Sequence, residues 1–292
     1  MTHSISAAIR NIMFLSALML CQLACSQTTT VEVTDPRPVA EAVAQLERIY
    51  GWPITYEDPI IVYGSRMEDI TEQVQRAPGL SHRVMGRKEG RLSFTFRLPS
   101  SLPDYGGDPL QYKTEAEKAI MDALASILKS YAASGAPETF AVREEDGIFH
   151  MVPTGFLNKE GKLQPMEPIL DTKITIVSKQ RTRQSLLDEI CQSLTNASEI
   201  DVECLLPFDS RAMQKETTIS GSDVVARTLI SQLMAELTAP TTVDVFIYGP
   251  DGEKVPKRAV LSEPSRLYSW QLLYGIGDGY ALSAHRVALA DR

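Results

Sequence analysis

The pattern of apolar and polar positions in residues 38–58 occurs a second time in the chain. When Leu46 is aligned with Leu194, apolar residues coincide at further positions, namely Val39 with Leu187, Ala42 with Ile190, Val43 with Cys191, Trp52 with Ile200 and Ile54 with Val202. In both copies these residues recur at helical spacing, and a short alternating segment follows a turn. The pattern therefore predicts the sequence helix, turn and strand twice.

Around the first copy, the pattern predicts more strands and one long helix. Residues 28–34 and 91–98 alternate as strands do, residues 114–134 have helical spacing, and residues 140–145 and 147–153 form a predicted hairpin. Pro38 suits the first position of a helix, and Gly51 suits its end. Residues 58–90 mix charges with proline and glycine, which predicts an insertion with one helical turn at residues 67–75.

Around the second copy, the same analysis predicts a similar order of elements. We expect strands at residues 173–177, 200–205 and 216–219, and a connection at residues 208–215. One helix is expected from Thr182, and Ser222 is expected to cap the next. A hairpin within residues 241–264 and a closing hairpin of residues 267–274 with 280–287 complete the prediction. The predicted class is α+β. We expect two tandem βαβ–βαββ modules, residues 27–163 and 164–292, each with a small mixed sheet and helices packed on one face.

Residues 1–26 have the features of a targeting segment. Arg10 precedes an apolar run at residues 12–24, which is short for a membrane span, and small residues follow it. We expect cleavage after Ser26 and export to the periplasm. The alternative is an outer-membrane lipoprotein, lipidated at Cys25, although Gln22 stands where a lipobox prefers an aliphatic residue.

Cys191 and Cys204 are the cysteines that remain after such a cleavage. In an oxidising compartment the pair can bridge a helix to the following strand. Alternatively, both are buried thiols, with Cys191 on the apolar face of its helix. The sequence leaves the two alternatives open.

The charge of the chain argues against nucleic-acid binding. Its 37 acidic and 29 basic side chains give a net charge of −8, and the basic residues form no block. Nucleic-acid-binding domains normally have clustered lysine and arginine.

Several segments resemble the short N-terminal domain shared by secretins and TonB-dependent receptors, the STN domain. In the second half these are LTNASEIDV at residues 194–202, TISG at 218–221, VARTL at 225–229, SWQL at 269–272 and YALS at 280–283; in the first half it is LERIYGWPITY at 46–56. The insertions at residues 58–90 and 241–264 depart from the family pattern. Secretins and TonB-dependent receptors continue into a ring or barrel, and we expect none here. The resemblance implies a free-standing cell-envelope protein that binds another protein and has no catalytic residue.

Two further hypotheses come from other residues. Trp52, Tyr56 and Tyr63 form an aromatic cluster next to two acidic residues, which suits contact with a partner, a small molecule or a peptidoglycan fragment, although the alignment of Trp52 with Ile200 favours a core position. Ser126 and Lys129 match the S-x-x-K motif of penicillin-recognising serine hydrolases. The other motifs of that family are missing, so we expect no enzyme.

His82, His150 and His285 lack metal-ligand spacing, and we expect no cofactor or metal.

Export generates the first testable prediction. Protein purified from its native host should have the intact mass of residues 27–292, because signal peptidase removes the leader. A diacylglycerol increment on Cys25 would instead identify a lipoprotein. The mass of the full chain would contradict export.

Overall fold

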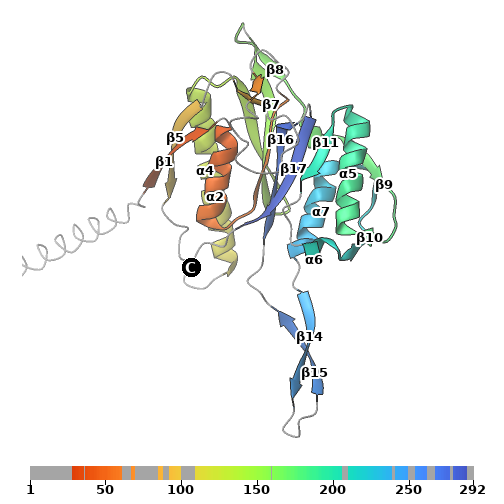
Figure 1. The fold of residues 1–292 in the computed structure, drawn as a ribbon. Coiled ribbons are helices and arrows are strands. Elements are labelled where there is room, and N and C mark those ends of the chain that lie inside the picture. The colour runs from red at the N-terminus through yellow and green to blue at the C-terminus, as the bar shows by residue number, and fades with distance from the viewer. Residues whose placement is uncertain are drawn as a thin grey trace, which may run out of the picture.

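The structure is a computed structural model that describes residues 28–35, 37–60, 67–69, 85–87, 92–99, 109–158, 160–205, 210–238, 241–248, 254–261, 267–276 and 279–287. Its class is mixed α/β, which confirms the predicted class with small mixed sheets and helices. Figure 1 shows the arrangement of the elements.

The first half contains helices α2 and α4 and the strands around them. Strand β1 (Thr28–Asp35) precedes α2 (Pro38–Tyr50) and β2 (Ile54–Glu57), and the short strands β3 (Met67–Asp69) and β4 (Met85–Arg87) follow. Next come β5 (Leu92–Pro99), α4 (Pro109–Ala133), β6 (Glu138–Glu145), β7 (Ile148–Leu157) and β8 (Leu163–Pro165). Helix α2 ends as predicted, because Gly51 adopts the left-handed conformation with φ 62°.

The second half begins with the 3-10 turn η2 (Ile169–Asp171) and strands β9 (Lys173–Ile176) and β10 (Arg181–Thr182). Helix α5 (Arg183–Ser198) leads to β11 (Val202–Leu205), α6 (Ser210–Met213), β12 (Glu216–Thr217), β13 (Gly221–Val225) and α7 (Ala226–Thr238). The last strands are β14 (Thr241–Tyr248), β15 (Lys254–Leu261), β16 (Tyr268–Ile276) and β17 (Gly279–Arg286).

One seven-stranded sheet runs through both halves. Its order is β11-β17-β16-β2-β7-β6, and β8 also pairs with β7. Strands β2 and β16 meet in the middle as parallel neighbours, with Gln271 opposite Tyr56 and Leu272 opposite Glu57. The repeat predicted two small sheets, and their edges in fact join into one.

Part of the strand pairing is the same in the two halves. In the first half, β2 is parallel to β7, and β7 is antiparallel to β6. In the second half, β11 is parallel to β17, and β17 is antiparallel to β16. Each half also has a separate antiparallel pair, β1 with β5 in the first and β9 with β13 in the second.

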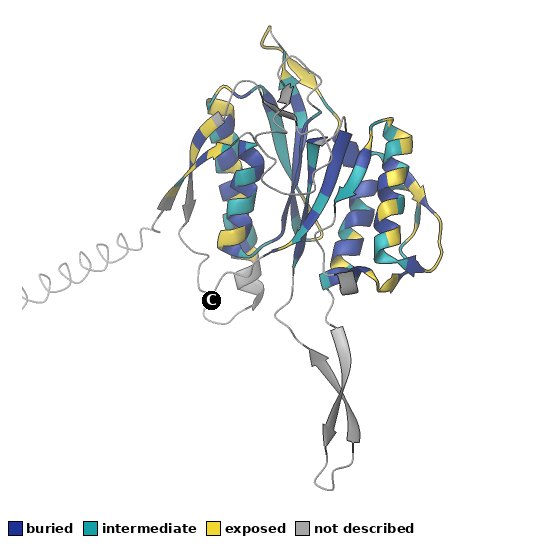
Figure 2. Cartoon of the chain, in the orientation of Figure 1, coloured by how far each residue is buried: buried dark blue, intermediate teal, exposed yellow. Residues whose placement is uncertain are grey.

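The helices of the two halves cover opposite faces of the joined sheet (Figure 1). One core packs α2 and α4 between the β1–β5 pair and residues of β2 and β7 such as Ile54 and Met151. The other packs α5 and α7 between the β9–β13 pair and residues of β16 and β17 such as Trp270 and Leu282. Figure 2 shows the buried positions along the sheet and along the inner sides of the helices. Within each half the helices lie on one face, as expected; the sheet as a whole has helices on both.

Three local predictions are wrong. Residues 67–69 form strand β3, paired with β4, where we expected a helical turn. Residues 210–213 form the short helix α6 within the expected connection. Ser222 lies in strand β13, and α7 starts only at Ala226, so Ser222 does not cap that helix.

The β14–β15 hairpin projects away from the sheet and helices (Figure 1). Its strands pair in register from Thr241 opposite Leu261 to Tyr248 opposite Lys254. This agrees with the hairpin predicted within residues 241–264.

Candidate functional site

The junction of β2 and β16 brings together buried charged side chains from both halves. Glu57, on β2, is fully buried, and so is Arg227, on α7. Arg227 donates from Nη2 to Glu57 at 2.8 Å and to Asp171 at 3.0 Å. Arg143, on β6, reaches the second carboxylate oxygen of Asp171 at 2.6 Å. Two arginines and two carboxylates therefore connect β2, β6, η2 and α7.

Burial is the largest influence on the pKa of Glu57 in this cluster. Loss of water raises the pKa of Glu57, and the guanidinium of Arg227 opposes that rise. The amide N–H of Leu170 also donates to Glu57, at 3.2 Å. Glu57 thus depends on partners from the second half for its charged form.

A second polar cluster surrounds Asp58, directly after β2. Its carboxylate accepts hydrogen bonds from Arg37 Nε at 2.7 Å, from the Tyr56 hydroxyl at 2.6 Å and from the backbone N–H of Tyr274 at 2.9 Å. The Tyr280 hydroxyl donates to the Asp58 carbonyl at 3.2 Å. Burial is the largest cause that raises the pKa of Tyr56, so its hydroxyl stays protonated. These contacts tie the end of β2 to β16 and β17.

A third contact joins the halves on the face of α2. Glu47 is 3% exposed, accepts from the backbone N–H of Ile54 at 2.9 Å and lies 2.7 Å from His285 Nε2. The Ser269 hydroxyl donates to the Ile54 carbonyl at 3.0 Å. All three clusters hold the halves together, and none has the geometry of a nucleophile with its base.

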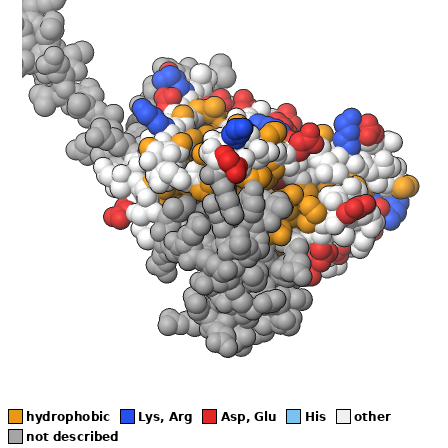
Figure 3. Space-filling model, turned by 90° about the horizontal axis from the view of Figure 1, so that it is seen from above, with side chains coloured by type: hydrophobic (Ala, Val, Ile, Leu, Met, Phe, Trp, Pro, Cys, Tyr) orange, Lys and Arg blue, Asp and Glu red, His pale blue; other side chains and the backbone are white. Residues whose placement is uncertain are grey.

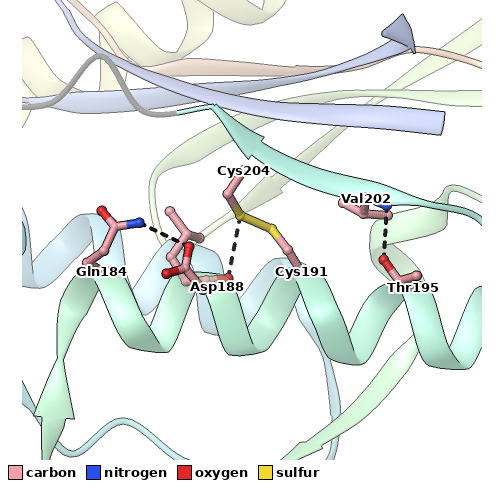
Figure 4. Close-up of a disulfide and its surroundings, with 7 residues drawn as sticks. Gln184, Asp188, Cys191, Thr195, Val202 and Cys204 are labelled. Atoms are coloured by element: carbon pink, nitrogen blue, oxygen red, sulfur yellow. Dashed lines mark hydrogen bonds between the residues drawn. A yellow bond between two sulfur atoms is a disulfide. The ribbon is translucent and has the colours of Figure 1, made fainter. Parts of the chain in front are cut away.

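Cys191 and Cys204 are joined by a disulfide in the structure, so the bridge is present where the sequence left two alternatives open. Their Cα atoms are 6.5 Å apart. The bridge connects α5 to β11, an outermost strand of the seven-stranded sheet (Figure 4). Close by, the Val202 N–H donates to the Thr195 hydroxyl at 3.0 Å, which fixes the start of the same strand (Figure 4).

Of the aromatic cluster predicted from the sequence, Tyr56 does not lie at the surface. Tyr56 is 2% exposed and belongs to the first core, so it is not available for contact with a partner. Trp52 is half-buried against that core and donates from Nε1 to the Gly147 carbonyl at 3.2 Å. Tyr63 and Cys25 lie outside the described residues.

The other candidates are dispersed. Ser126 is partly buried and Lys129 is exposed, both on α4. His150 and His285 contact different groups, Thr55 and Glu47, and His82 lies outside the described residues. Among the described side chains, no three His, Cys, Asp or Glu residues are grouped to hold a metal ion.

Sequence reasoning missed Glu57, Asp171 and Arg227 as a cluster. One signal was available, because Arg227 continues the apolar stripe of α7 at helical spacing from Ile230 and Met234. A charged residue at such a position needs a buried partner. The pattern does not say which carboxylate provides it.

The described surface seen from above carries acidic and basic side chains close together, with apolar side chains between them (Figure 3). Exposed large apolar residues include Leu157 and Leu163, which are register partners in β7 and β8. In the part of the chain that the structure describes, no helix is long and apolar enough to cross a membrane.

Comparison with known proteins finds no match, whether with family models, with curated proteins or with solved structures. The resemblance to the STN domain therefore stays a prediction.

The buried Arg227 generates a prediction about stability. Arg227→Met should lower the free energy of unfolding by about 3–5 kcal/mol, because it leaves Glu57 buried without its cation. Lys118→Met is the matched control, since Lys118 pairs with Asp122 on the surface, and should change stability by less than about 0.5 kcal/mol. Urea denaturation measures both.

The loss of stability in Arg227→Met, measured as the decrease in the free energy of unfolding, should depend on pH. A carboxyl whose folded pKa lies above its unfolded value stabilises most below the unfolded pKa and loses this contribution as pH rises. Without Arg227 the pKa of Glu57 rises further. The free energy of unfolding of the variant should therefore fall further below that of the natural protein at about pH 8 than at about pH 5. Adding Glu57→Gln should remove the difference, and a deficit that is independent of pH in Arg227→Met would contradict the assignment.

The disulfide generates a further prediction. Replacing both Cys191 and Cys204 with alanine should lower the free energy of unfolding by about 3 kcal/mol, because the unfolded chain gains conformational freedom. A reductant should destabilise the natural protein and leave the double variant unchanged. Rapid reaction of both cysteines with a thiol reagent in the folded, unreduced protein would show that they are free.

Proposed function

We propose that this chain is a non-catalytic interaction protein of the bacterial cell envelope, built of two STN-like modules that together bind a protein partner. The observation that carries the proposal is the strand pairing that the two halves share. Strand β2 is parallel to β7 as β11 is parallel to β17, and β7 and β17 are each antiparallel to the strand before them. Among the quoted segments of the resemblance, residues 46–56 reach β2, residues 269–272 lie in β16 and residues 280–283 lie in β17.

The buried polar residues support a structural role for the junction. The ion pairs of Glu57 and Arg227 and the hydrogen bonds of Asp58 connect elements of both halves. The bridge between Cys191 and Cys204 suits an oxidising compartment such as the periplasm. A firmly joined body of this kind can present a surface to a partner with little loss of conformational freedom on binding.

The β14–β15 hairpin is the element that we assign to the partner. It projects from the body (Figure 1), and an isolated two-stranded hairpin is only marginally stable in water. Strand β14 has apolar residues at positions 243 and 245–247, and the register pairs three of them with apolar residues of β15, Val243 with Ala259, Phe246 with Pro256 and Ile247 with Val255. A partner protein that covers these positions would stabilise the hairpin.

Two observations weigh against the alternative function, binding of a small molecule or a peptidoglycan fragment. Tyr56 is buried. The space between the halves is occupied by the pairing of β2 with β16 and by the ion pairs beside it.

Site-specific crosslinking in the native host tests the proposal. A photo-crosslinking amino acid at position 248, in β14, should form a covalent adduct with one defined protein. The same amino acid at position 118, on the exposed side of α4, is the matched control and should form none. Replacing residues 241–261 by a short Gly-Ser linker should abolish binding of that protein and keep the body folded, because Thr241 and Leu261 are register partners.

Other results would favour the other hypotheses. Absence of an adduct at position 248, together with a small molecule or peptidoglycan fragment that raises the melting temperature, would contradict the proposal in favour of a ligand-binding protein. Covalent labelling of Ser126 by a fluorophosphonate or a penicillin would revive the serine hydrolase.

A further inference from the structure

Three buried nitrogen atoms beside the junction have no hydrogen-bond partner among the described residues. They are His150 Nε2, Arg227 Nη1 and Trp270 Nε1. His150 and Arg227 are fully buried, and Trp270 is 1% exposed. Buried polar atoms of native proteins are almost always paired, either with protein groups or with ordered water. Three such atoms in one region therefore point to a bound molecule.

The three residues lie next to one another on the sheet face that α7 covers. The rings of His150 and Trp270 have centroids 5.8 Å apart, and Arg227 Cζ lies 5.8 Å from the centroid of the same indole. None of the three nitrogens forms a hydrogen bond with another of them. Because the groups that carry them are neighbours, a single intervening molecule can contact more than one of them.

The charges around this place are already balanced. Arg227 donates to Glu57 and Asp171, and Arg143 donates to Asp171, so two carboxylates accompany the two guanidinium groups. Burial is the main cause that lowers the pKa of His150 to about 3, so its imidazole is neutral near neutral pH. Nothing in this balance demands an additional anion.

The hydrogen-bonding capacities define the missing partner. Arg227 Nη1 and Trp270 Nε1 can only donate. His150 Nδ1 lies 2.7 Å from the Thr55 hydroxyl. When Nδ1 carries the proton and donates it to Thr55, Nε2 is an acceptor. The partner must then accept two hydrogen bonds and donate one, and it must be small and neutral.

We propose that His150, Arg227 and Trp270 form a binding site for one buried water molecule. The water accepts hydrogen bonds from Arg227 and Trp270 and donates one to His150 Nε2. Buried waters typically make about three hydrogen bonds of this kind and belong to the structure. Because β7 is in the first half and β16 and α7 are in the second, this water links the halves of the protein.

A high-resolution crystal structure of the full mature chain, with a parallel bromide soak, tests the site. We expect an ordered water within hydrogen-bonding distance of at least two of the three nitrogen atoms, and no anomalous signal from bromide there. A bromide peak at this place would show that the site binds an anion and would overturn the assignment of a water. Direct protein partners for all three nitrogens would overturn the site itself.

Nuclear magnetic resonance of the natural protein tests the same proposal without any variant. Long-range ¹H–¹⁵N correlation reports which nitrogen of His150 carries the proton, and the proposal requires Nδ1. Protonation of Nε2 would overturn it. The chain has only two tryptophans; the Trp270 indole N–H should show a cross-peak to long-lived water, and Trp52, which donates to Gly147, is the internal control.

Discussion

The parallel pairing of β2 with β16 is the constraint on which the rest of this structure depends. It converts two small sheets into one, and it places residues of each half next to helices of the other. Strand pairing satisfies backbone groups that an exposed edge would leave open. It also takes Glu57 and Asp58 out of water, since Glu57 is one of the paired residues and Asp58 follows it directly.

Buried charges are costly, and their partners come from segments far away in the sequence. Glu57 is paired by Arg227, and Asp58 by Arg37 and the Tyr274 backbone. Ion pairs of this kind contribute little net stability compared with apolar residues of similar size, whereas loss of one partner is strongly destabilising. We interpret them as groups that select one register and one orientation of the halves, because any other arrangement leaves a buried charge alone.

Much of the local structure follows from short-range pattern. Pro38, the apolar residues after it and Gly51 set the start, the buried face and the end of α2, and residues 28–35 and 92–99 alternate as strands. The exceptions have identifiable reasons. Residues 67–69 are a strand because β4 pairs with them, and the pattern of so short a segment cannot show that. Ser222 has the chemistry of a helix cap, but pairing of β13 with β9 extends the strand past it.

The sequence by itself determined the mixed α/β class and most of the longer helices and strands, because the helical and the strand periodicities of apolar positions are properties of the chain. It also brought Cys191 and Cys204 within reach of each other, since a helix and the next strand are close in any such unit. Only the tertiary structure decided that the sheets merge, that the helices lie on opposite faces and that Tyr56 is buried. It also decided that Arg227 meets Glu57. These outcomes depend on contacts between residues far apart in the chain, such as that of Arg227 with Glu57, and apolar spacing along the chain contains no information about which distant edge a strand will join.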